Sequence, residues 1–172
     1  KVAALKASAS SAEEQKATAH AKALIDLAAQ YPQLKRSDSD YSGGKLAAVN
    51  ARILLKAAFK GVKFSVKSDY NSLRIEWQDG PTDAQVNDVV GMFDIGASDT
   101  QSDYFYTVST AFSDLFGGVQ YLTTTRNTSD ALIQEAIDHA FKNNDEKPTL
   151  SDWKTGANEM GWGDWKRRWV NE

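Results

Sequence analysis

Apolar residues recur at helical spacing twice in the first third of the chain. The first series follows a capping box, Ser11 to Glu14, so we expect a helix to begin there. It stops before Pro32, because proline disfavours the helical conformation of the preceding residue. The second series ends at Gly61, a residue type that commonly terminates helices. The apolar positions are Ala17, Ala21, Leu24, Ile25 and Ala28 in the first series, and Leu46, Val49, Ile53, Leu54, Ala57 and Ala58 in the second.

Apolar and polar residues then alternate strictly, first from Val62 to Lys67 and again from Leu73 to Gln78. A period of two is typical of a strand with one buried face. The residues between the two segments, 69–72, are turn-forming types. We therefore expect the two strands to pair as an antiparallel hairpin.

Two more helices and one more strand complete the expected core. Thr82 is a candidate N-cap for the third helix, and Thr128 or Ser129 for the fourth. Residues 119–126 are rich in β-branched and aromatic side chains, which favour a third strand. The order α-β-β-α-β-α predicts an α+β fold, a three-stranded antiparallel sheet with helices packed on one face, because that arrangement needs only short connections. The fourth helix would turn six apolar residues inward: Leu132, Ile133, Ala136, Ile137, Ala140 and Phe141.

Composition shifts along the chain predict three segments. The polar stretch 35–44 ends in two glycines, which is typical of a linker. The expected segments are an Ala-rich N-terminal helix (1–34), an α+β core domain (45–142) and a Trp-rich helical tail (143–172) that packs on the core. Within the core domain, residues 94–118 are irregular but rich in aromatics, so we expect them to pack onto the core rather than form a loop in solvent.

The overall charge and the missing cysteines narrow the function classes. The formal net charge is −3 and there is no Cys, which excludes disulfides, thiolate catalysis and cysteine-bound metal centres. The mild acidity argues against a whole-surface nucleic-acid binder but leaves room for a local basic face. No apolar run approaches the roughly 18 residues of a membrane span. We therefore expect a cytoplasmic protein with no bound cofactor, no metal and no membrane partner. Because the chain begins at Lys1 rather than Met, we also expect a processed or excised piece.

A basic face is predicted on the hairpin. Lys63, Lys67 and Arg74 should share its outward side, and Arg126 lies near the end of the third strand. Such a face could contact phosphates or a partner protein. The alternative is an ordinary solvated face on which Glu76 pairs with the cations.

The tail carries the second candidate surface. Trp162, Trp165 and Trp169 are spaced three and four residues apart, so in a helix they would form one stripe. The cations on its flanks are Lys166, Arg167 and Arg168. Aromatics interleaved with cations suit a partner-binding hot spot or a base-stacking platform. The alternative is that the stripe closes the domain by docking on the sheet or on the first helix.

The run from Leu54 to Ser68 resembles the signature of a large polyvalent-protein-associated domain family. The resemblance covers roughly residues 46–142 and implies a module of the multidomain proteins carried by phages and conjugative plasmids, with a role in protecting incoming DNA. The further segments that carry it are Trp77–Thr82, Asp103–Tyr106, Gln120–Arg126 and Ser129–Asp130.

The expected function is a non-enzymatic binding module of a mobile genetic element, acting in anti-defence of the anti-restriction or anti-CRISPR type. Its partner would be a host defence protein or nucleic acid, and a homo-oligomer remains open. The alternative is a protein docking module of a larger assembly with no nucleic-acid contact. An enzyme with a site among Arg126, Tyr104, Tyr106 and the loop aspartates is the third interpretation. It is disfavoured because no catalytic motif is present and neither His20 nor His139 has a carboxylate partner at catalytic spacing.

Overall fold

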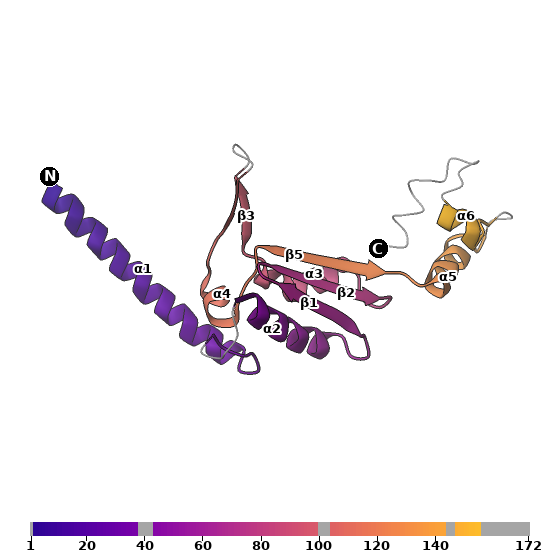
Figure 1. Ribbon diagram of the computed structural model, residues 1–172, viewed down its shortest axis with the longest axis horizontal. Helices are drawn as coiled ribbons and strands as arrows, with labels where there is room; N and C mark the ends of the chain where they lie inside the picture. Colours follow the sequence, from indigo (N-terminus) through magenta and orange to yellow (C-terminus); the bar gives the residue numbers. More distant parts are fainter. Residues whose placement is uncertain (1, 38–42, 100–103, 144–146, 156–172) are drawn as a thin grey trace.

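The computed structural model describes residues 2–37, 43–99, 104–143 and 147–155. Figure 1 shows helix α1 projecting at one end of the molecule, with α5 and α6 beyond the opposite end of the sheet. The elements in chain order are α1 (Val2–Gln30), α2 (Gly43–Ala58), β1 (Phe64–Asp69), β2 (Ser72–Gln78), α3 (Asp83–Val90), the 3-10 helix η1 (Gly91–Phe93), β3 (Gly96–Asp99), β4 (Tyr104–Thr107), α4 (Ala111–Phe116), β5 (Tyr121–Asn127), α5 (Asp130–Ala140) and α6 (Leu150–Thr155).

Helix α1 is longer than the sequence pattern predicts. It ends at Gln30, as expected from Pro32, but it begins at Val2, so the prediction of a start at Ser11 is wrong. Seven of the ten residues before Ser11 are Ala, Lys or Leu, all strong helix formers, and the helix continues through the capping-box sequence. Although α1 has 29 residues, neither it nor any other described helix is long and apolar enough to cross a membrane.

The main sheet has the order β1-β2-β5. Strands β1 and β2 form the predicted antiparallel hairpin, with Val66 opposite Ile75. Strand β5 pairs with β2 in parallel, with Thr124 beside Ile75, so the expectation of a fully antiparallel sheet is wrong. The physical reason is the connection between β2 and β5, which contains α3, η1, β3, β4 and α4. A connection of that length returns the chain to the starting end of β2, as parallel pairing requires.

One face of this sheet forms the core. Leu73, Ile75 and Trp77 alternate along β2 and are buried, and helices α2 and α3 pack over them as predicted. Thr82 caps α3 through a capping box with Gln85, which confirms the predicted helix start. The core cluster also contains Leu34, Ala47, Ala48, Ala51, Leu55, Val66, Val86, Val90, Phe93, Phe116 and Val119.

The aromatic stretch before β5 is partly as expected. Phe112 and Phe116 of α4 pack against each other with ring centroids 5.0 Å apart, and Phe93 lies 5.3 Å from Phe112, so these rings do join the core. The same stretch also contains an unpredicted two-stranded sheet of β3 and β4, on which Tyr106 is exposed.

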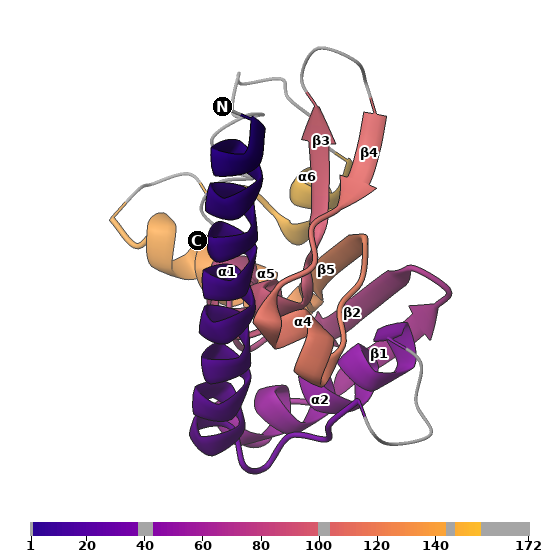
Figure 2. The same cartoon turned by 90° about the vertical axis from the view of Figure 1, so that its left-hand side faces the viewer.

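The end of α1 packs beside α4, as Figure 2 shows. The Tyr31 ring lies 5.8 Å from Phe112 and 6.0 Å from Phe116, both edge-on, and Leu27 also contacts the core cluster. Residues 13–22 are exposed, whereas Leu27 is partly buried against the core. Among the residues of α1 whose burial is described, those of the last turns are the ones that pack into the core.

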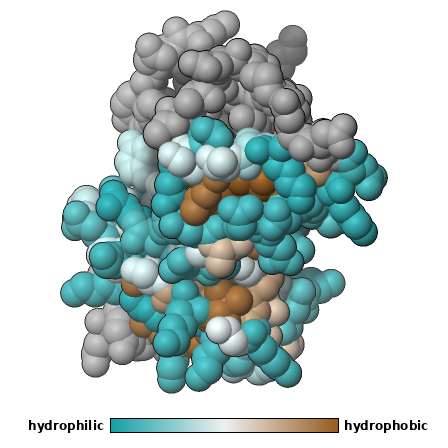
Figure 3. Space-filling model, turned by 90° about the vertical axis from the view of Figure 1, so that its right-hand side faces the viewer, coloured by the Kyte–Doolittle hydropathy of each residue, from teal (hydrophilic) through white to brown (hydrophobic). Residues whose placement is uncertain are grey.

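Helix α5 begins at the predicted cap, Ser129, but it does not pack on the sheet with α2 and α3. Its apolar stripe forms a second cluster with α6, consisting of Ile133, Ile137 and Phe141 with Leu150 and Trp153 against them. In Figure 3, which faces this end of the molecule, apolar side chains appear in separate patches with hydrophilic ones between them. The expectation that this stripe belongs to the sheet core is therefore wrong.

Candidate binding surface

The outer face of the main sheet carries two opposed cations. Lys67 on β1 pairs directly with Arg74 on β2, and both side chains are exposed. The alternation of each strand forces them onto the face opposite the core, because their neighbours Val66 and Ile75 are buried. Like charges placed opposite each other across two strands destabilise the pair. The structure thus places Lys67 and Arg74 side by side on one exposed face.

Helix α2 adds a second row of cations. Lys45, Arg52 and Lys56 are seven and four residues apart, so they share one side of the helix, and all three are exposed. The guanidinium of Arg52 donates a hydrogen bond to the backbone oxygen of Val66. This contact places Arg52 against edge strand β1, whereas Lys67, the next residue of that strand, lies on the opposite face of the sheet.

Two lysines lie between these rows along the chain. Lys60 and Lys63 occupy the connection from α2 to β1, and both are exposed. We call the whole set the basic strip, and it consists of Lys45, Arg52, Lys56, Lys60, Lys63, Lys67 and Arg74. Among the described residues, none of these seven cations forms an ion pair.

The segment 43–78 that contains the basic strip holds two carboxylates, Asp69 and Glu76, so its formal charge is +5 in a chain of net −3. The Asp69 carboxylate accepts a hydrogen bond of 2.9 Å from the backbone N–H of Tyr70. Glu76 lies opposite Ser65, and not opposite a cation, in the β1–β2 register. The cross-strand partnership with Glu76 that would make this an ordinary solvated face is therefore not formed among the described residues.

Arg126 does not belong to the basic strip. It stands beside Trp77 in the β2–β5 register, on the core side of the sheet, and it is only partly exposed. Its guanidinium donates a 3.1 Å hydrogen bond to the backbone oxygen of Gly80. The alternation of β5 explains this position, because Arg126 shares one face of the strand with Leu122, which packs against the core.

The Trp-rich tail contributes nothing further to the described surface. Trp162, Trp165, Lys166, Arg167, Arg168 and Trp169 all lie outside the described residues. Trp153 is the tail tryptophan that the structure describes, and it packs against the Ile133 cluster.

The predicted site missed the cations of α2 and of the connection that follows it: Lys45, Arg52, Lys56 and Lys60. A signal for them exists in the sequence, because no Asp or Glu occurs between residues 41 and 68. The pattern of charges along the whole chain, and not only on the predicted strands, indicates these additional cations.

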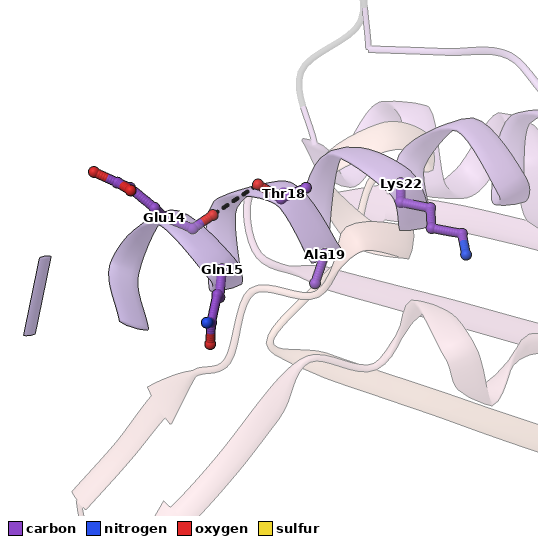
Figure 4. Close-up of a pocket in the computed structure, with 5 residues that line it drawn as sticks. All are labelled: Glu14, Gln15, Thr18, Ala19 and Lys22. Carbon is purple, nitrogen blue, oxygen red and sulfur yellow. Dashed lines mark hydrogen bonds between the residues drawn. The ribbon is translucent and has the colours of Figure 1, made fainter. Parts of the chain in front are cut away.

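Two other features lack the geometry of a binding or catalytic site. Figure 4 shows a hollow along α1 lined by Glu14, Gln15, Thr18, Ala19 and Lys22, whose side chains point in different directions. Thr18 donates to the backbone oxygen of Glu14 at 2.8 Å, a bond within the helix.

The second feature is a surface cluster between α1 and α4. His20 Nε2 lies 3.2 Å from Asp114 Oδ2, a carboxylate partner that the sequence alone did not reveal. Ser109 donates to the same carboxylate rather than to the imidazole. A serine nucleophile needs the histidine itself as its base, so this cluster joins α1 to α4 without the geometry of nucleophilic catalysis.

The family model described as Large polyvalent protein associated domain 29 matches residues 42–129. This span is slightly more than half of the chain, and it contains the basic strip and all three strands of the main sheet. The predicted resemblance to a family of this kind is confirmed. No curated protein and no solved structure matches the chain.

Proposed function

On the premise that this chain belongs to the Large polyvalent protein associated domain 29 family, we propose that it is a non-catalytic module that binds the phosphate backbone of nucleic acid through the basic strip. The family context is consistent with a protein carried by a mobile genetic element. The finer role, protection of incoming DNA from host defence, is part of the same proposal.

The observation that carries the proposal is the opposed pair of Lys67 and Arg74. Two exposed like charges in register cost folding free energy, and no described carboxylate neutralises them. A phosphate backbone bound across the pair would offset that repulsion, and Lys and Arg are the usual donors to phosphate oxygens. The α2 row lies on the helix that covers the other face of the sheet and reaches edge strand β1 through Arg52, so a linear polyanion that binds both groups would cross that edge.

A host defence protein with an acidic surface is the alternative partner. It would use the same cations, since electrostatic complementarity also guides protein association. The salt dependence of binding distinguishes the two partners. Each DNA phosphate bound by a cation releases a condensed counterion, so binding to DNA weakens steeply as the salt concentration rises.

The test is fluorescence anisotropy with short labelled DNA, single-stranded and duplex, between about 50 and 200 mM salt. We expect binding that weakens steeply with salt. The double variant Lys67→Glu/Arg74→Glu should lower the slope of log K against log salt by about 0.9 for each duplex phosphate that the variant no longer binds.

A matched control keeps the change in net charge but moves it elsewhere. Lys22 on α1 and Lys142 after α5 are both exposed and lie outside the basic strip. The double variant Lys22→Glu/Lys142→Glu should retain binding and its salt slope. Equal loss of affinity in both double variants, or no association of the unmodified protein with either DNA at low salt, would refute the proposal and favour the protein docking alternative.

A further inference from the structure

Two exposed tyrosines lie at one end of the main sheet. Tyr121 begins β5 and stands beside Ser72 in the parallel register, on the same face as Arg74 and Thr123. Tyr70 lies in the β1–β2 turn and is 91% exposed, while Tyr121 is 48% exposed. The backbone N–H of Tyr121 donates to the oxygen of Asn71 at 3.1 Å, so β5 starts directly against the turn that holds Tyr70.

The parallel direction of β5 is what creates this juxtaposition. An antiparallel β5 would place Tyr121 at the far end of β2, away from the turn. In the observed register, Ser72 of β2 lies beside Tyr121. Arg74 is two residues further along β2, about 7 Å from Ser72 in the strand direction. Lys67 continues the same row on β1. One exposed face therefore carries an aromatic ring and, one row away, two cations.

We propose that the ligand of this surface is single-stranded nucleic acid, with Tyr121 and Tyr70 stacking on bases while Lys67 and Arg74 hold the phosphates. This inference rests on the proposed function, which by itself requires only a phosphate backbone. Exposed aromatics beside a positively charged track are the combination by which proteins bind single strands without sequence preference. Paired bases in a duplex are stacked on one another and leave no face for these rings.

The experiment compares a labelled oligothymidylate of about 12 nucleotides with a duplex of the same length by anisotropy at low salt. The single strand should bind about tenfold more tightly than the duplex. Tyr121→Leu should weaken single-strand binding by about tenfold and leave duplex binding unchanged, whereas Tyr121→Phe, which keeps the ring, should bind as the unmodified protein does.

Tyr70 supplies a second variant that does not disturb the sheet, because it lies in an exposed turn. Tyr70→Leu should also weaken single-strand binding. The control is Tyr106→Leu, since Tyr106 is 43% exposed on β4, outside the main sheet, and should contribute nothing.

The outcomes separate the two proposals. Equal affinity for single strand and duplex, with no effect of either tyrosine variant, would overturn this inference and leave phosphate binding by the basic strip standing. No association with either nucleic acid would overturn both.

Discussion

At the scale of single residues, Asn50 shows how a polar side chain can hold the core together. It is fully buried on α2, and its amide accepts from the backbone N–H of Lys35 at 2.7 Å. The same amide donates to the backbone oxygens of Lys35 at 2.8 Å and Phe116 at 2.9 Å. One side chain thus ties α2 both to the segment after α1 and to the end of α4.

Asn50→Ala should therefore destabilise the protein by about 3 kcal/mol, because it leaves buried backbone groups without hydrogen-bond partners. Urea denaturation followed by circular dichroism measures this change. The control is Asn87→Ala, where the amide accepts a 3.2 Å hydrogen bond from Thr124 at an exposed position and should cost less than about 1 kcal/mol. Equal costs for the two variants would contradict this role of Asn50.

The sequence could not have identified Asn50. The apolar spacing of the second helix was correct, but an asparagine beside that stripe is typical of a surface residue. Its partners are 15 and 66 residues away along the chain, and they are backbone groups that every sequence contains. The strands of the hairpin, in contrast, were predictable because a period of two reports burial directly.

At the scale of elements, α2 and α4 meet so closely that one position admits only glycine. Gly117 ends α4 with a φ of 85°, and a Cβ there would lie 2.5 Å from the backbone oxygen of Gly43 and 2.7 Å from the nitrogen of Ala47. Gly117→Ala should thus combine backbone strain with a clash against backbone atoms and cost about 3 kcal/mol.

Gly61→Ala is the matched control for this prediction. Gly61 has nearly the same φ, 87°, but no atom lies within 4 Å of the added Cβ. Gly61→Ala should lower the free energy of unfolding by only about 1 kcal/mol, because its one penalty is a Cβ in the left-handed conformation. Thermal unfolding of the two variants side by side measures the difference, and an equal destabilisation would mean that the packing of α4 against α2 adds no constraint.

The direction of β5 was beyond the reach of the sequence pattern. The strand itself was visible from its β-branched residues, yet neighbours in a sheet can run either way. Direction depends on how many residues the connection uses, and the β3–β4 hairpin inside it was hidden among loop-like residues. Arg126 was misplaced for a different reason: it shares the alternation of Leu122, which packs against the core, and so faces away from Lys67 whichever way β5 runs.

At the scale of the whole molecule, the buried apolar residues that the structure describes form two clusters. The α5–α6 cluster joins the sheet through the end of β5, where Asp79 accepts a 2.8 Å hydrogen bond from the backbone N–H of Ser129. Few apolar residues of the described chain belong to this cluster, and a cluster of that size has little stability of its own. Cooperative units of this kind open separately from the rest of a protein.

We therefore expect the backbone amides of α5 to exchange with solvent through a local opening, and those of α2 and β2 through global unfolding. Native-state hydrogen exchange in low urea distinguishes the two routes by their denaturant dependence. If α5 amides showed the same opening free energy and the same urea dependence as β2 amides, the two clusters would unfold as one.

The projecting helix α1 also has a hydrodynamic consequence. A helix of 29 residues is about 44 Å long, whereas a compact chain of 172 residues has a radius of gyration of only about 16 Å. Friction in solution depends on the longest dimension, so a monomer should elute from a sizing column ahead of a spherical standard of 18.9 kDa. An early peak would thus imitate a dimer, and the number of chains per particle has to be taken from scattered light.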